Sequence, residues 1–405
     1  MRHGSMNDIT PIPVRRIALP IYTATVLVAL GRGTMLLLIP IQGLQLGGLT
    51  GGFGLPGMFA LGAVFTNVPG AFAVTRYGHR PVLLGGLLVS TVAALGVAYS
   101  PSLSAMVVSS FAYGVGQGLF AFARVTYLSD TVEPAQRGRV VSALGGSHRV
   151  GMFAGPAAGG LLAALLDRPT ALATVALCTL LALVVLGRWL PRGTTVPAAQ
   201  PSTAWSIVGR VLSEHRRTFA TAGVAMFALG LIRNGRMLLI PICGTVLGLA
   251  EDEVGLVKSM SMGIDMVLFY PAGVVMDRYG RKWAAAPCLA VLSVGLLLIG
   301  AADTYAELLV GGLVAGLGNG VGSGINMTLA GDLSPRAGRA EFLGVWGLTS
   351  DIGAAGAPFA MAAVASALSL GGAAVATAGI GLAGAVIVVF GMRETLVRDR
   401  PAAPG

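Results

Sequence analysis

The sequence predicts an all-α polytopic membrane protein with twelve transmembrane helices in two pseudo-symmetric six-helix bundles. Apolar residues make up 55% of the 405 residues, and charged residues only 11%. Soluble domains contain roughly a quarter charged residues, so lipid has to cover much of this surface. Twelve apolar windows are each long enough to span a bilayer, and several segments of the first half of the chain recur in the second half.

The predicted spans are separated by short polar turns, except for one longer polar segment after the sixth. The spans are 19–42, 50–73, 80–99, 104–127, 140–164, 170–190, 219–243, 254–276, 284–301, 305–329, 341–366 and 370–392. They divide the chain into an N-terminal tail (1–18), an N-terminal bundle (19–190), a linker (191–217), a C-terminal bundle (218–392) and a C-terminal tail (393–405).

Lysine and arginine are concentrated in alternate turns, which predicts the orientation of the chain. The tails, the linker and one set of turns hold 20 of the 27 basic residues: Arg2, Arg15, Arg16, Arg76, Arg80, Arg137, Arg139, Arg188, Arg192, Arg210, Arg216, Arg217, Arg278, Arg281, Lys282, Arg336, Arg339, Arg393, Arg398 and Arg400. Because basic loops stay in the cytoplasm, we expect a multi-pass plasma-membrane protein with both termini cytoplasmic. The net charge of +10 then belongs to membrane turns, and no nucleic-acid partner is expected.

Four segments of the first half are repeated in the second half, in the same order. The matching pairs, at offsets of 201 or 202 residues, are 31–41 with 232–242, 69–80 with 271–282, 114–118 with 316–320, and 147–156 with 349–358. Six spans separate each pair, so both copies begin on the same side of the membrane. The halves are therefore parallel repeats of the kind found in secondary transporters.

The repeated basic turn resembles the loop motif of the major facilitator superfamily (MFS), roughly G-x-x-x-D-R-x-G-R-K. The second-half copy matches at Gly273, Asp277, Arg278, Gly280, Arg281 and Lys282. The first-half copy keeps Arg76, Gly78 and Arg80 but has Ala71 and Thr75 in place of the glycine and the aspartate. The resemblance covers nearly the whole chain and implies the MFS fold, with these loops as charged gating latches. We expect Glu341 to replace the missing first-half acid by pairing with Arg76 or Arg80.

A second motif lies in the span 140–164. Its residues are Gly151, Gly155, Pro156, Gly159 and Gly160, and it resembles the fifth-helix motif of drug:proton antiporters in the same family. Glycines at i, i+4 and i+8 give a smooth face that a neighbouring helix can approach closely, and the proline permits a bend. The alternative is small-residue packing without a transport role. Where related efflux proteins carry an arginine in the fourth helix, this chain has Gly114.

Six ionisable residues fall in the middle of predicted spans, where an unpaired charge is costly. They are Arg32, Arg149, Arg233, Arg236, Asp265 and Asp351. We expect the two aspartates to carry protons, Asp265 first, as a nearby arginine moves between two states; static ion pairs are the alternative. The four arginines are expected to make the substrate cavity positive, which suits an anionic or zwitterionic substrate. Lys258 is expected to extend outward to the interface.

These features favour a secondary active transporter that exports a small-molecule drug or metabolite by alternating access. The sequence has no nucleotide-binding, nucleophile or metal motif, so we expect no enzyme activity, metal or cofactor, and a proton gradient as the driving force. The alternative is a proton-coupled symporter that imports a polar or anionic metabolite. A membrane sensor and a lipid-processing enzyme are disfavoured, because the tails are short and no reactive cluster is visible. The resemblance implies a monomer in the lipid bilayer.

Overall fold

The computed structural model describes residues 14–190 and 204–396, which are helical with no β-strand among them. The N-terminal bundle contains α1 (Val14–Phe65), α2 (Asn67–Tyr77), α3 (His79–Ala98), α4 (Leu103–Thr131), α5 (Pro134–Leu165) and α6 (Arg168–Trp189). The later helices are α7 (Ala204–Glu214), α8 (Arg216–Thr218), the π-helix η1 (Phe219–Gly223), α9 (Val224–Val246), α10 (Glu251–Tyr279), α11 (Lys282–Gly300), α12 (Tyr305–Val321), α13 (Ile325–Leu333), α14 (Arg339–Ala367), α15 (Leu370–Val386) and the π-helix η2 (Ile387–Gly391).

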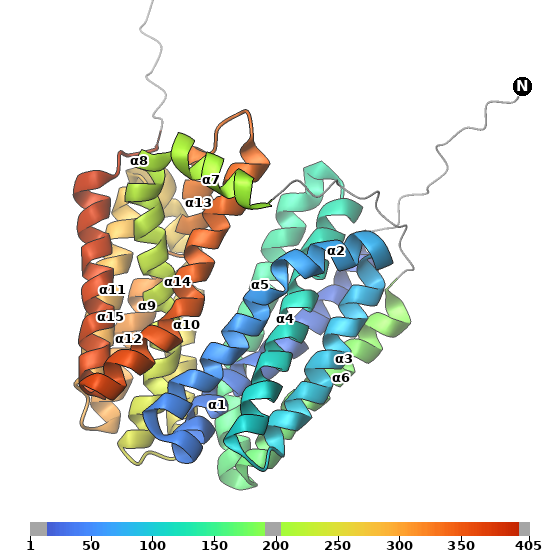
Figure 1. Cartoon of the computed structure of the whole chain (residues 1–405), viewed down its shortest axis with the longest axis vertical. Helices are drawn as coiled ribbons and strands as arrows, with labels where there is room; N and C mark the ends of the chain where they lie inside the picture. Colours follow the sequence, from blue (N-terminus) through green and yellow to red (C-terminus); the bar gives the residue numbers. More distant parts are fainter. Residues whose placement is uncertain (1–13, 191–203, 397–405) are drawn as a thin grey trace, which may run out of the picture.

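The two bundles stand side by side, in contact at the lower end of Figure 1 and diverging toward the upper end. The upper end carries the motif turns at Gly78 and Gly280 and is called the basic face below. The lower end carries the turn at Gly47–Gly48 and the start of α10, and is called the opposite face. The all-α, two-bundle architecture predicted from the sequence is confirmed.

Ten helical segments among the described residues are long and apolar enough to cross a membrane. One of them, α1, contains two predicted spans, because the chain turns at Gly47 and Gly48, where Gly48 has a φ of 58°. Gly43 and Gly51 then pack against each other across this turn. Helix α5 is not among the ten, since its predicted span is largely glycine and alanine and includes His148 and Arg149. It nevertheless packs as the fifth pass between α1 and α10.

Two predicted spans are interrupted in the structure. The span 50–73 ends at Phe65, and a separate helix, α2, carries the first motif turn. The span 305–329 breaks between α12 and α13, where Gly324 adopts a φ of 87°. Only glycine takes up this left-handed backbone readily, so the Gly322-Ser323-Gly324 segment ends α12 inside the predicted membrane region.

Side chains on the opposite face satisfy the first backbone N–H groups of the helices that begin there. Ser102, Asp167, Thr304 and Ser369 accept hydrogen bonds at the N-termini of α4, α6, α12 and α15. At the start of α10, the Glu253 carboxylate accepts from the Ala250 N–H at 3.0 Å. These caps are local signals in the sequence, and they explain why the spans begin where they do.

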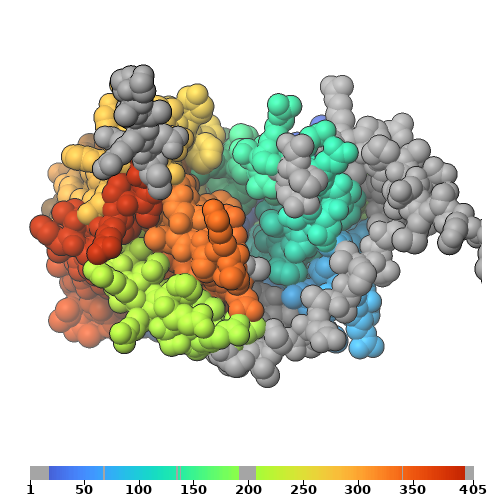
Figure 2. Space-filling model, turned by 90° about the horizontal axis from the view of Figure 1, so that it is seen from above, coloured from blue at the N-terminus to red at the C-terminus, as the bar shows by residue number. Residues whose placement is uncertain are grey.

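Part of the predicted linker is helical. Helix α7 lies within 191–217 and packs against α14 on the basic face, where Figure 2 shows it in yellow-green beside the orange segment of α14. Residues 191–203 of the linker, 1–13 of the N-terminal tail and 397–405 of the C-terminal tail lie outside the described residues.

The buried apolar core is continuous between the bundles. Its larger cluster includes Leu37 and Phe53 of α1 together with Ile240 of α9 and Val257 of α10, all fully buried or nearly so. These residues lie toward the opposite face, so apolar packing joins the bundles at the end where Figure 1 shows them in contact.

Close helix contacts in the C-terminal bundle predict opposite effects for two glycine-to-alanine changes. A Cβ at Gly316 of α12 would lie 2.3 Å from the Ser261 carbonyl oxygen of α10, whereas a Cβ at Gly347 of α14 meets nothing within 4 Å. We expect Gly316→Ala to cost about 1–3 kcal/mol through overpacking, and Gly347→Ala to be neutral or stabilising through helix propensity. Thermal unfolding of both variants in detergent measures the difference, and equal unfolding temperatures would contradict this packing.

Candidate functional site

A cavity of about 270 Å³ lies between the two bundles, midway between the faces. It is lined by α1 and α4 of the N-terminal bundle and by α9 and α14 of the C-terminal bundle. The lining residues are Arg32, Leu36, Pro56, Phe59, Ala60, Ala63, Val64, Gln117, Gly118, Ala121, Phe122, Asn234, Leu238, Asp351, Ala354, Ala355 and Pro358. A mostly apolar wall with a few polar groups is typical of a site for a small molecule.

Two charged side chains face this cavity from opposite bundles. The Arg32 guanidinium lies over the Phe59 ring, 5.2 Å from its centroid, and finds no acceptor in residues 14–190 or 204–396. Asp351 is an exposed residue on α14, and no described group pairs with it or donates to it. The other polar lining residues are engaged: Gln117 donates to Ser90, and Asn234 donates to the Ala354 carbonyl. The cavity therefore offers one unpaired cation and one unpaired anion.

Asp265 lies outside this cavity, at the centre of a cluster of ion pairs and hydrogen bonds. Its Oδ1 is 3.2 Å from Arg149 Nη1, and its Oδ2 is 3.5 Å from Arg236 Nη2. Asn319 and Ser323 also donate to the carboxylate. Arg149 comes from α5, whereas the other partners belong to the C-terminal bundle, so this ion pair joins the two bundles.

The break between α12 and α13 helps to build this cluster. The Gly322 carbonyl accepts from Arg233 Nη2 at 3.0 Å as well as from the Ile325 N–H, and the Ser323 hydroxyl lies 2.9 Å from Arg149 Nη2. Arg233 also donates to Asn319 at 2.6 Å. Discontinuous helices with free backbone groups at mid-membrane are common at transporter sites.

The structure separates the arginines that the sequence grouped around one cavity. Only Arg32 lines the cavity between the bundles, whereas Arg149, Arg233 and Arg236 surround the Asp265 cluster. Arg233 and Arg236 share one face of α9, as their spacing predicts, but that face is turned toward α10 and α12. The expected excess of positive charge in the cavity is therefore replaced by one arginine and one aspartate.

The glycines of the helix-5 motif are placed at two helix contacts. A Cβ at Gly151, Gly155 or Gly159 would meet α1 at 2.4–2.5 Å. A Cβ at Gly160 would lie 2.2 Å from the Glu251 carbonyl oxygen of α10, and the Pro156 carbonyl contacts Gly255 of the same helix. One face of α5 thus packs within its own bundle, and the other packs on the opposite bundle.

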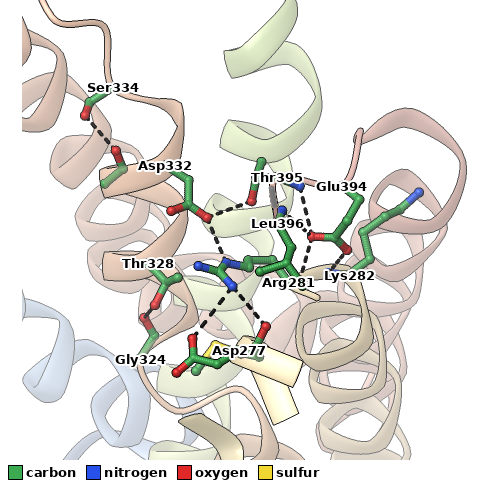
Figure 3. A network of polar contacts seen from close by, with 12 residues as sticks. Asp277, Arg281, Lys282, Gly324, Thr328, Asp332, Ser334, Glu394, Thr395 and Leu396 are labelled. Atoms are coloured by element: carbon green, nitrogen blue, oxygen red, sulfur yellow. Dashed lines mark hydrogen bonds and ion pairs between the residues drawn. The ribbon is translucent and has the colours of Figure 1, made fainter. Parts of the chain in front are cut away.

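The second-half loop motif forms a polar network on the basic face (Figure 3). The Arg281 guanidinium is 2.8 Å from Asp332 and 3.7 Å from Asp277. The Glu394 carboxylate accepts from the backbone N–H groups of Arg281, Lys282, Thr395 and Leu396. This network joins α10, α11, α13 and the segment after η2.

The remaining motif residues of the second half are peripheral. Lys282 Nζ donates to the Val389 carbonyl at 2.8 Å, and the Arg278 guanidinium lies over the Tyr279 ring. Gly280 ends α10 with a φ of 115°, which glycine adopts readily. Gly273 has open space where a Cβ would stand.

The first-half motif makes a different set of contacts. His79 Nε2 is 3.1 Å from Asp130, Arg80 donates to the Gly187 carbonyl of α6, and the Arg76 guanidinium lies over Tyr77. Gly78 again takes a positive φ, 84°. The expected pairing of Glu341 with Arg76 or Arg80 is wrong, because Glu341 lies in the C-terminal bundle and pairs there with Arg210 of α7.

Lys258 is also placed differently from the expectation. Its side chain is 1% exposed, and its Nζ donates to the backbone carbonyls of Leu36 and Met237. It therefore stays inside the protein instead of extending to the interface. Acceptors for this ammonium exist only in the folded chain, so the sequence offered no simple signal for them.

Several residues of the site were missed by sequence reasoning. Asn319 occupies the position of Gln117 in the repeat, and Asp332 occupies that of Asp130, both at an offset of 202. Asn319 lies inside the matched segment 316–320, and extending the repeat beyond its matching segments could have found Asp332. Ser323 and Glu394 carry no comparable signal. Within residues 14–190 and 204–396, no three His, Cys, Asp or Glu side chains gather where a metal could be held.

Residues 21–232 and 222–405 each match the family model of the Major Facilitator Superfamily. The chain belongs to this superfamily. It is accordingly a multi-pass membrane transporter and not an enzyme, and the resemblance inferred from the loop motif is confirmed.

Relatives of known sequence include transporters, matched over part of their length. The MFS-type transporter ppzB of Metarhizium rileyi is 36% identical over 104 residues, which is 26% of this chain and 22% of the relative. The multidrug resistance protein MdtH of Aeromonas hydrophila is 24% identical over 245 residues, 59% of this chain and 58% of the relative. The class C tetracycline resistance protein of Escherichia coli is 36% identical over 90 residues, 22% of each. The chain thus spans less than two thirds of each of these relatives.

Among solved structures, a POT family transporter in complex with 5-aminolevulinic acid is similar over 92% of this chain and 96% of its own, with a TM-score of 0.74 and 12% identity. A POT family transporter in complex with a thioalcohol-conjugated peptide gives the same TM-score and identity over 92% of this chain and 95% of its own. At this identity the likeness establishes the fold.

The two membrane aspartates should differ in their importance for stability. Asp265→Asn leaves Arg149 and the buried Arg236 without their anion, and removing one partner of a buried pair costs about 3–5 kcal/mol. Asp351→Asn removes no described contact, and its effect should stay within about 0.5 kcal/mol. Thermal unfolding in detergent tests this order; a larger loss for Asp351→Asn would contradict the assignment of partners.

Glu394 should make stability depend on acid pH. Burial alone would raise its pKa, but the backbone N–H groups of Arg281, Leu396, Lys282 and Thr395 hold the pKa of this carboxyl below its ordinary value of 4.5. Its contribution is therefore fully present above that value and is lost as the pH falls through the lower folded-state pKa. The unfolding temperature of Glu394→Gln, followed from neutral to acid pH, should fall less steeply than that of the wild type. Asp303→Asn, an exposed change on the opposite face, should follow the wild type.

Proposed function

We propose that this protein exports small molecules across the plasma membrane in exchange for protons, as a monomer with both termini in the cytoplasm. The two bundles would rock about the cavity between them, exposing it to each side in turn. Contacts between the bundles on the opposite face support this mechanism. Arg168 of α6 pairs there with Glu251 of α10, and Gly160 of α5 packs closely on the same residue. Figure 1 corresponds to a state that is closed on that face.

The substrate class follows from the two unpaired charges of the cavity, and this observation carries the proposal. Arg32 supplies a planar donor for a carboxylate or phosphate, and Asp351 supplies an acceptor for an ammonium group. They face the cavity from different bundles, with apolar residues between them. A small molecule with one group of each sign would satisfy both charges, so we propose zwitterionic compounds as substrates.

Proton coupling would involve both aspartates in different ways. Asp351 faces the cavity without a described partner, so substrate and proton can compete for it directly. Asp265 is held by Arg149 from the other bundle and by Arg236 from its own. A carboxylate that loses a neighbouring guanidinium takes up a proton more readily. Separation of α5 from α10 would remove Arg149 from Asp265, and this exchange of partners would link bundle movement to proton coupling.

Export is favoured by the helix-5 motif and by the names of two relatives. Gly151, Gly155 and Gly159 allow α5 to approach α1 closely, and Pro156 and Gly160 contact the other bundle. Two of the relatives are named for multidrug and tetracycline resistance. The second candidate is import of a polar or anionic metabolite together with protons, which the unpaired guanidinium of Arg32 favours.

Everted membrane vesicles acidified inside test the proposal with a pH-sensitive dye. An exchanger should release internal protons when a zwitterionic substrate is added, whereas a symporter would take protons inward with the substrate. Cationic and anionic compounds of similar size should have weaker effects. We expect Asp351→Asn and Arg32→Gln to lose at least about 90% of the response, a factor of ten or about 1.4 kcal/mol. Asp265→Asn should uncouple substrate movement from protons, and Asp303→Asn should leave the response intact.

Labelled substrate measured in the same vesicles separates the outcomes. Substrate movement without any change in internal pH would contradict proton coupling and indicate a uniporter. A response that survives in Asp351→Asn and Arg32→Gln would contradict the proposed substrate site.

A further inference from the structure

Lys258 is the most completely buried cation among the described residues that make no ion pair. It lies on α10, closer to the opposite face than Asp265 does, and only 1% of its side chain is exposed. Its Nζ is 2.5 Å from the Leu36 carbonyl oxygen of α1 and 2.9 Å from the Met237 carbonyl oxygen of α9. Leu36 also lines the substrate cavity, so the lysine lies directly behind the cavity wall.

Both acceptors are carbonyls that a proline has freed. In an α-helix the N–H of residue i bonds to the carbonyl of residue i−4, and proline has no N–H. Pro40 therefore frees the carbonyl of Leu36, and Pro241 frees that of Met237. Pro40 and Pro241 are equivalent positions in the two halves. One ammonium thus donates to the equivalent proline-freed carbonyl in both halves of the repeat.

The two bonds differ in what they connect. The bond to Met237 stays within the C-terminal bundle, whereas the bond to Leu36 crosses to the N-terminal bundle. Two neighbouring residues of α10 make further contacts across the same boundary: Gly255 packs on the Pro156 carbonyl, and the Ser259 hydroxyl accepts from the Ala157 N–H at 2.9 Å. The stretch 255–259 is therefore attached to α1 and α5 through polar groups.

We propose that Lys258 is a positioning residue of the transport cycle, which clamps the bundles together in the state closed on the opposite face. Opening to that face requires the bond to Leu36 to break, while the bond to Met237 keeps the ammonium in its own bundle. Separation leaves the buried ammonium and the Leu36 carbonyl without each other as hydrogen-bond partners. This costs free energy until water or substrate reaches them. This role rests on the proposed alternating access but not on proton coupling or on the direction of transport.

The test measures from which side of the membrane the cavity can be labelled, without substrate or gradient. A single reporter, Ala355→Cys, is placed in the cavity wall after Cys178, Cys243 and Cys288 are replaced by alanine. A membrane-impermeant maleimide is added to intact cells or to everted vesicles. A separate reporter, Asp303→Cys on the opposite face, establishes which side is exposed in each preparation.

Lys258→Met keeps an unbranched side chain, one heavy atom shorter than lysine, and removes the donors. We expect it to raise labelling of the reporter from the opposite face about tenfold relative to labelling from the basic face, a shift of about 1.4 kcal/mol. Unchanged sidedness in Lys258→Met, even with lower thermal stability, would overturn the proposal and leave the lysine as a packing residue.

Proline variants keep the proposal testable if Lys258→Met fails to fold. Pro40→Ala supplies a backbone N–H to the Leu36 carbonyl. Because this N–H competes with the Lys258 ammonium for the carbonyl, labelling should shift in the same direction. The effects of Pro40→Ala and Lys258→Met should not add, because both act on one bond. Pro287→Ala, at a helix proline of α11 that Lys258 does not contact, should leave sidedness unchanged. Additive effects, or an equal shift in Pro287→Ala, would contradict the clamp.

Discussion

The cost of a charge or free backbone group in apolar surroundings governs the centre of this protein. Asp265 has two guanidinium partners, Arg233 bonds to an amide and a carbonyl, and Lys258 bonds to two carbonyls. Each of these groups finds its partners outside its own helix. The helices are consequently held in one arrangement by polar bonds as well as by apolar packing, and among the described residues that line the cavity Arg32 and Asp351 are left for a ligand.

Bonds that cross between the bundles differ from those that stay within one. The pair of Arg149 with Asp265 and the bond from Lys258 to Leu36 both cross, whereas the network around Arg281 stays within the C-terminal bundle. Movement of one bundle against the other therefore changes the few polar contacts that cross between the bundles. The contacts within each bundle stay intact. Alternating access needs this division between bonds that persist and bonds that exchange.

The two halves share a fold but differ in their charges. Asn319 binds Arg233 and Asp265, while its counterpart Gln117 donates to Ser90 and to no other group in 14–190 or 204–396. On the basic face, the pair of Arg281 with Asp332 corresponds to that of His79 with Asp130. The C-terminal bundle therefore holds most of the charged network, and the N-terminal bundle contributes single arginines to the interface.

The sequence by itself determined the twelve passes, the two-bundle repeat and the family, because apolar length and a repeat offset of about two hundred residues are properties of the chain alone. It also singled out Asp265, Asp351 and the four arginines as charges inside the predicted spans. Only the tertiary structure decided which of them meet, since the faces of α9 and α5 depend on how the helices pack. It turned Arg149, Arg233 and Arg236 toward Asp265 and left Arg32 opposite Asp351. It also placed Lys258 beside two proline-freed carbonyls, that of Leu36, more than two hundred residues away in the chain, and that of Met237, about twenty residues away. Only folding brings these groups together.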